Sequence, residues 1–276
     1  MIFKQILEVP AVIKQYINKP DVFNALLRMQ GKTFRDVKGR KTIQVRLYSE
    51  NGVVQSYFIK QHFGVGWREI IKNLTAIKWP ILGAMTEVKA IQKLNALNIA
   101  TTPLVAYGQR GHNPATLQSF VLTADLGDIT SLEDLTMDWP ANPPDAIFKR
   151  KLIIAVAKIA KKLHENGINH RDFYIGHFCL DNLSKPEIKL YLIDLHRVLI
   201  HAKPSINGNM KDIAALYFSS MDIGLTKRDL MCFKKHYSKM DKQFWQQVES
   251  RATKLYAKFH SQKFQQRLKK EKSAIH

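Results

Sequence analysis

The stretch His170-Arg171-Asp172-Phe173-Tyr174-Ile175-Gly176-His177, followed by Asp194 at the end of the apolar run Leu190-Tyr191-Leu192-Ile193, decides how this chain folds and works. A His-Arg-Asp triplet in a loop, with a strand ending in Asp roughly twenty residues later, supplies two separate carboxylates. One of them can accept a proton from an attacking hydroxyl, and the other can hold Mg²⁺ against nucleotide phosphates. The stretch therefore predicts a site for phosphoryl transfer.

The composition is that of a globular, reduced protein. The 276 residues are 45% apolar, which allows one large domain or two lobes. Cys179 and Cys232 lie far apart and form no Cys-x-x-Cys pair, which argues against a disulfide scaffold or a zinc site. Charge interrupts the N-terminus before a signal peptide can develop, and lysines break the best apolar stretch, residues 152–163. We expect a soluble, cytoplasmic protein that can touch a membrane surface.

The net charge of +20 is unevenly distributed along the chain. Residues 227–276 carry 14 Lys or Arg against 4 Asp or Glu, a net of +10, which is half of the excess. Such a surface attracts an anionic partner: nucleic acid, acidic lipid headgroups, a phosphorylated glycan or an acidic protein.

The order of the predicted elements indicates an α+β fold with two lobes. Residues 1–30 are helix-like, residues 33–60 read as strands around an Asn51-Gly52 turn, residues 66–97 are mostly helical, and short strands follow near 104–107 and 119–123. The second half is mainly helical, with further helices beginning near Lys211 and Thr226. Asp212 is expected to cap the first of these and to have a structural role, tying the catalytic loop from below. We predict a single domain 1–276, with a small strand-rich N-lobe, residues 1–123, that carries an N-terminal helical extension. A larger helical C-lobe, residues 124–276, ends in a basic helical region.

The ordered set of strand lysine, helix glutamate, His-Arg-Asp loop and strand-end Asp resembles the protein-kinase fold. More narrowly, the chain resembles the lipopolysaccharide core heptose(I) kinase family. Three segments carry this similarity: Phe63 to Leu74, Gly167 to Phe178 and Leu216 to Asp229. An Ala-Pro-Glu segment and a long activation loop are absent from the sequence, which argues for a small-molecule or glycan acceptor.

The resemblance implies a role for each acidic residue of the motif. Asp172 is the expected catalytic base, and the neighbouring His170 and Arg171 are expected to hold the catalytic loop in shape. Asp194 stands where kinases place their Mg²⁺-binding Asp, although the motif reads Asp-Leu-His rather than Asp-Phe-Gly. His177 occupies the usual place of a metal-binding Asn. Because Mg²⁺ prefers oxygen ligands, His177 either binds the metal, hydrogen-bonds a phosphate or fixes Asp172.

Three further residues are assigned to the nucleotide. Lys60 ends a strand and is expected to reach the α- and β-phosphates of ATP. Glu87 is the expected partner of Lys60, with Glu69 as the alternative. Gly39 lies in a phosphate loop that has one glycine instead of Gly-x-Gly-x-x-Gly, so basic side chains replace the usual backbone contacts or the loop is a simple turn.

The resemblance predicts an ATP- and Mg²⁺-dependent kinase of the first heptose of the lipopolysaccharide inner core. Its partners would be that acceptor, the anionic cytoplasmic face of the inner membrane and an acidic protein. One alternative keeps the chemistry and changes the acceptor to another sugar, a small molecule or a protein hydroxyl. A second alternative is a nucleic-acid-binding protein on an inactive kinase scaffold. The presence of both carboxylates and Lys60 argues against it.

Overall fold

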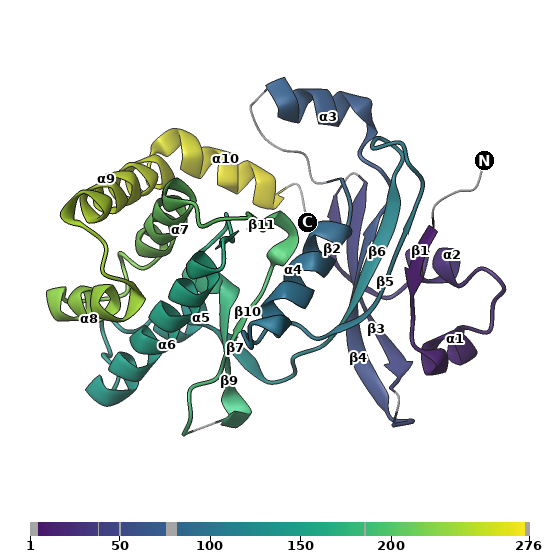
Figure 1. Cartoon of the computed structure of the whole chain (residues 1–276), viewed down its shortest axis with the longest axis horizontal. Coiled ribbons are helices and arrows are strands. Elements are labelled where there is room, and N and C mark those ends of the chain that lie inside the picture. The colour runs from purple at the N-terminus through teal and green to yellow at the C-terminus, as the bar shows by residue number, and fades with distance from the viewer. Residues whose placement is uncertain (1–4, 38, 50, 76–81, 185, 274–276) are drawn as a thin grey trace. The chain divides into compact units, whose positions relative to one another are not determined.

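The computed structural model describes residues 5–37, 39–49, 51–75, 82–184 and 186–273, and the chain divides into two compact units. The strand-rich unit comprises Met1–Gly127 and Asp194–Val198, and the helical unit comprises Asp128–Ile193 and Leu199–His276. Figure 1 traces the elements of both units. The lobe boundary predicted at residues 123/124 stays a prediction.

The strand-rich unit is built on a six-stranded antiparallel sheet with the order β1-β5-β6-β4-β3-β2. The strands are β1 (Gln5–Glu8), β2 (Lys32–Val37), β3 (Arg40–Tyr48), β4 (Val54–His62), β5 (Leu104–Arg110) and β6 (Gln118–Ala124). Ile43, Val45 and Leu47 alternate along β3 and are buried, which is the period of a strand with one face in the core. Gly52 forms the predicted turn between β3 and β4 with a φ of +73°.

The N-terminal extension is helical only in part, so the prediction for residues 1–30 needs one correction. Residues 5–8 form β1, which pairs antiparallel with β5 from Gln5↔Arg110 to Glu8↔Tyr107. Four residues are too few to show a period, and the pairing partner lies about a hundred residues away, so local sequence carries no signal for it. The helices of this unit are α1 (Ala11–Ile17), α2 (Val22–Leu27), α3 (Gly66–Thr75) and α4 (Met85–Ala96), with a 3₁₀ turn, η3, at Leu195–Arg197.

The helical unit contains six α-helices among the residues that the structure describes. They are α5 (Leu132–Thr136), α6 (Ala146–Glu165), α7 (Ile206–Ser219), α8 (Lys227–Tyr237), α9 (Lys242–Phe259) and α10 (Gln262–Ser273). Short strands β7 (Ile129–Ser131), β9 (Phe178–Asp181) and β10 (Leu190–Leu192) form one small sheet, and β8 (Ile168–Asn169) pairs with β11 (Leu199–Ile200). In the described part of the chain, no helix is both long and apolar enough to cross a membrane.

The chain enters the catalytic loop from the end of α6. Leu152, Val156 and Leu163 are buried along one face of this helix, as their spacing predicts. The helix ends at Glu165, and Gly167 follows with a φ of +71°. A Cβ at Gly167 would lie 2.6 Å from the carbonyl oxygen of His201, so the turn that leads into β8 requires glycine.

The prediction that Asp212 caps a helix is wrong. Helix α7 begins at Ile206, and its N-cap is Ser205, whose hydroxyl accepts a hydrogen bond from Gly208 N at 3.1 Å. Both Ser and Asp satisfy the N-cap preference, so local sequence could not choose between them. Asp212 consequently lies in the second turn of α7, where it is 2% exposed.

Candidate active site

In the strand-rich unit, Lys60 forms an ion pair with Glu87. The Lys60 Nζ lies 2.6 Å from Glu87 Oε1, and Asp194 Oδ1 lies 3.8 Å from the same nitrogen. Lys60 projects from β4, between β3 and β6, and Glu87 is a buried residue of α4. Burial alone would lower the pKa of Lys60, but the Glu87 and Asp194 carboxylates outweigh it and raise the pKa, so the side chain is a cation. Glu69, the alternative partner, lies 3.6 Å from Lys72 instead.

Asp194 has a left-handed backbone conformation, and its carboxylate is hydrogen-bonded to His196. Its φ of +61° is in the left-handed region, which Asp tolerates better than most residues. Oδ1 is 2.5 Å from His196 Nδ1, while the side chain stays 30% exposed. No group of three or more His, Cys, Asp or Glu could hold a metal within the described ranges. An accessible carboxylate by itself fits Mg²⁺, which binds one or two carboxylates and completes its shell with phosphate and water oxygens.

Gly39 lies in the hairpin between β2 and β3 and is required there by geometry. Its φ is +80°, and a Cβ would lie 2.5 Å from the Gly64 carbonyl oxygen. The Gly39 carbonyl accepts a hydrogen bond from Phe63 N at 2.9 Å, which ties the hairpin to the segment that precedes α3. Lys38, the other residue of the predicted phosphate loop tip, lies outside the described residues.

Of two basic residues beside this hairpin, Arg40 belongs to the predicted phosphate loop and His62 was not singled out from the sequence. Arg40 and His62 are opposite each other on β3 and β4. Burial and the Arg35 guanidinium lower the pKa of Arg40, and the Asp194 carboxylate offsets part of this by raising it. Burial, with the cations Arg40 and Lys60, lowers the pKa of His62 to about 3, so its ring is neutral. The sequence predicted neither this pairing nor the interaction of Arg40 with Asp194.

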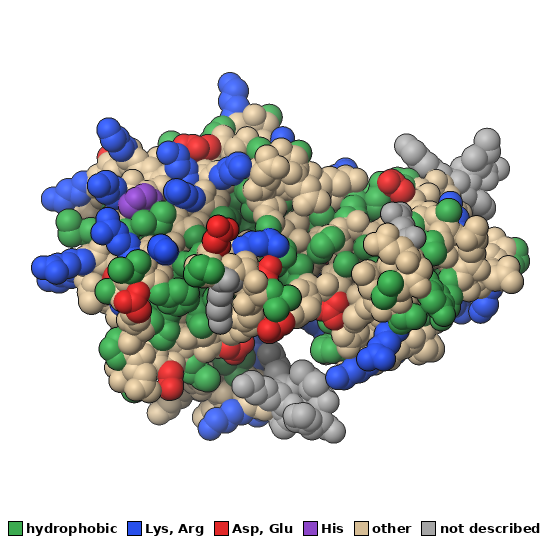
Figure 2. Space-filling model, turned by 90° about the horizontal axis from the view of Figure 1, so that it is seen from below, with side chains coloured by type: hydrophobic (Ala, Val, Ile, Leu, Met, Phe, Trp, Pro, Cys, Tyr) green, Lys and Arg blue, Asp and Glu red, His purple; other side chains and the backbone are tan. Residues whose placement is uncertain are grey.

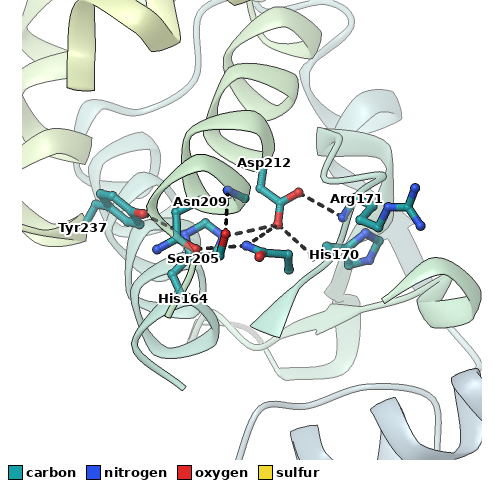
Figure 3. A network of polar contacts seen from close by, with 9 residues as sticks. His164, His170, Arg171, Ser205, Asn209, Asp212 and Tyr237 are labelled. Atoms are coloured by element: carbon teal, nitrogen blue, oxygen red, sulfur yellow. Dashed lines mark hydrogen bonds and ion pairs between the residues drawn. The ribbon is translucent and has the colours of Figure 1, made fainter. Parts of the chain in front are cut away.

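In the helical unit, the catalytic loop is held by the carboxylate of Asp212 (Figure 3). Asp212 Oδ2 accepts a hydrogen bond from His170 N at 2.7 Å, and Oδ1 accepts one from Arg171 N at 2.9 Å. Arg171 has a φ of +71°, a conformation that costs a non-glycine residue of order 1–3 kcal/mol and persists only where surrounding contacts hold it. Asp212 therefore fixes the backbone directly before Asp172. The role of tying the loop from below is confirmed.

A buried chain of side chains extends from Asp212 to α8. His164 Nε2 lies 3.3 Å from Asp212 Oδ2, and His164 Nδ1 lies 2.7 Å from the Tyr237 hydroxyl. A carboxylate can only accept, so Nε2 carries the proton, and the Tyr237 hydroxyl donates to Nδ1. Asn169 donates to Asn209 Oδ1 at 2.9 Å and to Asp212 Oδ2 at 3.4 Å. None of these three positioning residues, His164, Asn169 and Tyr237, was singled out from the sequence.

The two histidines of the motif act on the backbone in different ways. His170 is 1% exposed, and its Nε2 donates to the Ile193 carbonyl at 3.0 Å, so the ring fixes the strand end that precedes Asp194 in the sequence. Burial lowers the pKa of His170, which keeps the ring neutral. His177 Nδ1 donates to the Asp172 carbonyl at 2.6 Å. In the neutral ring the lone pair is then on Nε2.

The structure thus brings the predicted site residues together in two groups. Lys60, Glu87 and Asp194 meet in the strand-rich unit, where Gly39 forms the β2–β3 turn. His170, Arg171, Asp172 and His177 form one loop in the helical unit. A strand cation with a buried carboxylate partner, a strand-end Asp and a braced His-Arg-Asp loop are the parts of a kinase-like phosphotransferase. The roles of the individual residues stay predictions.

Comparison with known proteins identifies the family. The model of the lipopolysaccharide kinase (Kdo/WaaP) family matches residues 24–237, and the chain belongs to this family. The chain is 41% identical over 235 residues to the lipopolysaccharide core heptose(I) kinase WaaP of Pseudomonas aeruginosa, covering 84% of this chain and 85% of that protein. It is 43% identical over 220 residues to the enzyme of the same name from Escherichia coli K12, covering 79% and 81% of the two chains.

A solved structure matches the fold as well. The chain is similar to WaaP in complex with acyl carrier protein, with a TM-score of 0.75 and 35% identity, over 91% of this chain and 99% of that one. The predicted α+β, kinase-like fold class and the resemblance to the heptose kinases are both confirmed.

Proposed function

We propose that this protein is an ATP-dependent kinase that phosphorylates the first heptose of the lipopolysaccharide inner core. The acceptor follows from its identity of about 40% with enzymes that bear this name. The observation that carries the chemistry is the Lys60–Glu87 ion pair, 2.6 Å long, with Asp194 3.8 Å from the same ammonium. A cation held by one carboxylate beside a second, accessible carboxylate is suited to nucleotide phosphates and their metal ion.

Asp172 is the proposed catalytic base. Its carboxylate takes the proton of a heptose hydroxyl as that oxygen bonds to the γ-phosphorus of ATP, and the bond from phosphorus to the bridging oxygen breaks to release ADP. His170 and Arg171 serve this step by backbone position, because both amides are bound to Asp212. Catalysis is then mainly positioning and charge stabilisation.

Asp194 is the proposed ligand of Mg²⁺, since the hard cation prefers a carboxylate oxygen. Bound Mg²⁺ would neutralise phosphate charge during transfer. Lys60 stabilises the α- and β-phosphates as a cation, and Glu87 orients it. His177 contributes through Nε2: when this nitrogen is protonated it donates to a phosphate oxygen, a role that suits imidazole better than binding Mg²⁺ does.

We propose two anionic partners besides the acceptor. Figure 2 shows Lys and Arg side chains gathered on one face of the helical unit. Exposed basic residues also follow α9 and α10, including Arg251, Lys254, Lys258 and Lys263. An acidic carrier protein, such as the acyl carrier protein bound in the similar structure, and the anionic cytoplasmic face of the inner membrane both match this charge. The protein would act in the cytoplasm, at that membrane.

The direct test is transfer from γ-labelled ATP to lipopolysaccharide extracted from cells that lack the core heptose kinase, with mass spectrometry to locate the phosphate. Asp172→Asn should lose at least about a hundredfold in kcat, because general-base catalysis is worth that much. Asp145→Asn is the matched control, since Asp145 is an exposed N-cap that accepts from Ile147 N and Phe148 N.

Each outcome separates one reading from the others. The proposal is supported if the wild type and Asp145→Asn label the inner-core heptose and Asp172→Asn does not. ATP consumption without this product would move the acceptor to another sugar, a small molecule or a protein hydroxyl. The absence of metal-dependent ATP turnover would favour a binding protein on an inactive scaffold.

A further inference from the structure

Helix α3 carries an apolar face that the described part of the protein leaves uncovered. Trp67, Ile71 and Leu74 fall at positions i, i+4 and i+7 of this helix, so they lie on one side of it. They are 54%, 56% and 52% exposed. Among the side chains of α3 that the structure describes, Ile70 alone is buried. Most of the apolar side chains of α3 are therefore exposed, and only Ile70 is packed against the rest of the described protein.

The charges of α3 are arranged around this face. Arg68 lies beside the apolar stripe by helical position, and Lys72 and Glu69 lie on the far side of the helix, where they pair at 3.6 Å. Arg68 is exposed, and the Lys72 side chain is 75% exposed. An apolar stripe that contains Trp, with basic residues on the polar side of the same helix, is the pattern of a helix that lies in the interface of a lipid bilayer. Figure 1 shows α3 beyond the end of the sheet of its own unit, not across either face.

We propose that α3 inserts shallowly into an anionic lipid surface. Trp67, Ile71 and Leu74 enter the boundary between headgroups and acyl chains, and Arg68, beside the inserted face, contacts lipid phosphates. A net charge of +20 over the whole chain complements anionic lipid and disfavours pairing of two copies through this helix. The inference rests on the proposed function in one respect: a lipopolysaccharide acceptor is itself anchored in a membrane, so the enzyme must work at that surface.

The test uses the full chain and vesicles of phosphatidylcholine with phosphatidylglycerol. Ile71→Glu should weaken partitioning into these vesicles by at least about tenfold, because it places a charge in the inserted face. Ile147→Glu is the matched control: Ile147 is 66% exposed near the start of α6, and the substitution makes the same change of charge. It should bind within about twofold of the wild type. Vesicles with brominated acyl chains should quench tryptophan fluorescence of the wild type, and Trp67→Phe should reduce that quenching.

Equal vesicle binding by wild type and Ile71→Glu would overturn the inference. So would a wild-type dimer in light scattering that Ile71→Glu dissociates without any change in vesicle binding, since the face would then join two copies. Kinase activity is scored separately on water-soluble, deacylated core oligosaccharide, on which Ile71→Glu should equal the wild type. If the wild type transfers no phosphate but binds vesicles through α3, the proposed function fails and this inference stands.

Discussion

Replacing Asp212 by Asn tests how the catalytic loop is held. Asp212 is 2% exposed, and its two oxygens accept from the amides of His170 and Arg171 at 2.7 and 2.9 Å. In Asn one of these oxygens becomes an NH₂ group, which is a donor. Whichever way the amide turns, one buried backbone N–H then faces another donor.

The expected loss is about 3 kcal/mol of unfolding free energy. A hydrogen bond to a charged group contributes about 1.5–3 kcal/mol, and a buried donor without an acceptor costs about 1–3 kcal/mol. The lower desolvation of a neutral side chain offsets part of this sum. The activity effect follows from geometry: released from Oδ1, the strained Arg171 relaxes and shifts Asp172. We expect kcat to fall at least about tenfold, while the KM for ATP changes little.

The assays are urea unfolding followed by circular dichroism and steady-state phosphate transfer. Asp145→Asn is the matched control, because it makes the same substitution at a carboxylate that also accepts two backbone amides, at 3.0 and 2.8 Å, but is exposed. Asn is as good an N-cap as Asp, so this control should lose less than about 0.5 kcal/mol. Equal unfolding midpoints and equal kcat in the two variants would refute the role given to Asp212.

Tyr237→Phe extends the same reasoning one step along the chain of hydrogen bonds. It keeps the buried ring but removes the hydroxyl that donates to His164 Nδ1 at 2.7 Å. The Nε2–H tautomer of His164 should persist, because the Asp212 carboxylate still accepts from Nε2, but Nδ1 loses its hydrogen-bond donor and its ¹⁵N chemical shift should change. We expect a modest loss of kcat, about twofold to tenfold, since Asp212 keeps both backbone amides. An unchanged Nδ1 shift would show that Tyr237 does not donate to His164.

Three further outcomes follow from the strand-rich unit. Glu87→Gln should lower kcat/KM for ATP by at least about tenfold, because Lys60 loses its charged partner; unchanged kinetics would contradict the pairing role. Gly39→Ala should lower the unfolding free energy, measured in urea, more than Gly52→Ala does. Both residues have positive φ, but only at Gly39 would an added Cβ clash with another atom, the Gly64 carbonyl oxygen 2.5 Å away. His62 stays neutral in the folded protein, with a pKa of about 3 against 6.5 in the unfolded chain. The unfolding free energy should therefore fall as pH drops below about 6.5, by about 2 kcal/mol at pH 5. In His62→Gln, the urea concentration at the unfolding midpoint should change less with pH over this range.

The sequence predicts the residues of the kinase-like motif, including the Lys60–Glu87 pair, and misses the side chains that support the loop from other helices. The His-Arg-Asp loop and the Gly167 turn follow from residue types at short spacing. The cap of α7 was misassigned because Ser205 and Asp212 both satisfy the local rule, although the predicted tie between Asp212 and the catalytic loop is present. Tyr237 meets His164 across 73 residues of sequence, which no period or motif encodes.

The segment after Asp194 argues against a switch of the kind that a flipping Asp-Phe-Gly motif provides. Leu195 takes the place of Phe, is 1% exposed, and belongs to the turn η3 that packs against α4. Moving it into water would cost about 2 kcal/mol, and breaking the His196–Asp194 hydrogen bond would cost about 1 kcal/mol more. At equilibrium a cost of about 3 kcal/mol leaves roughly 0.6% of molecules flipped. The proposed insertion of α3 into lipid would instead bring the enzyme to an acceptor that is itself anchored in a membrane.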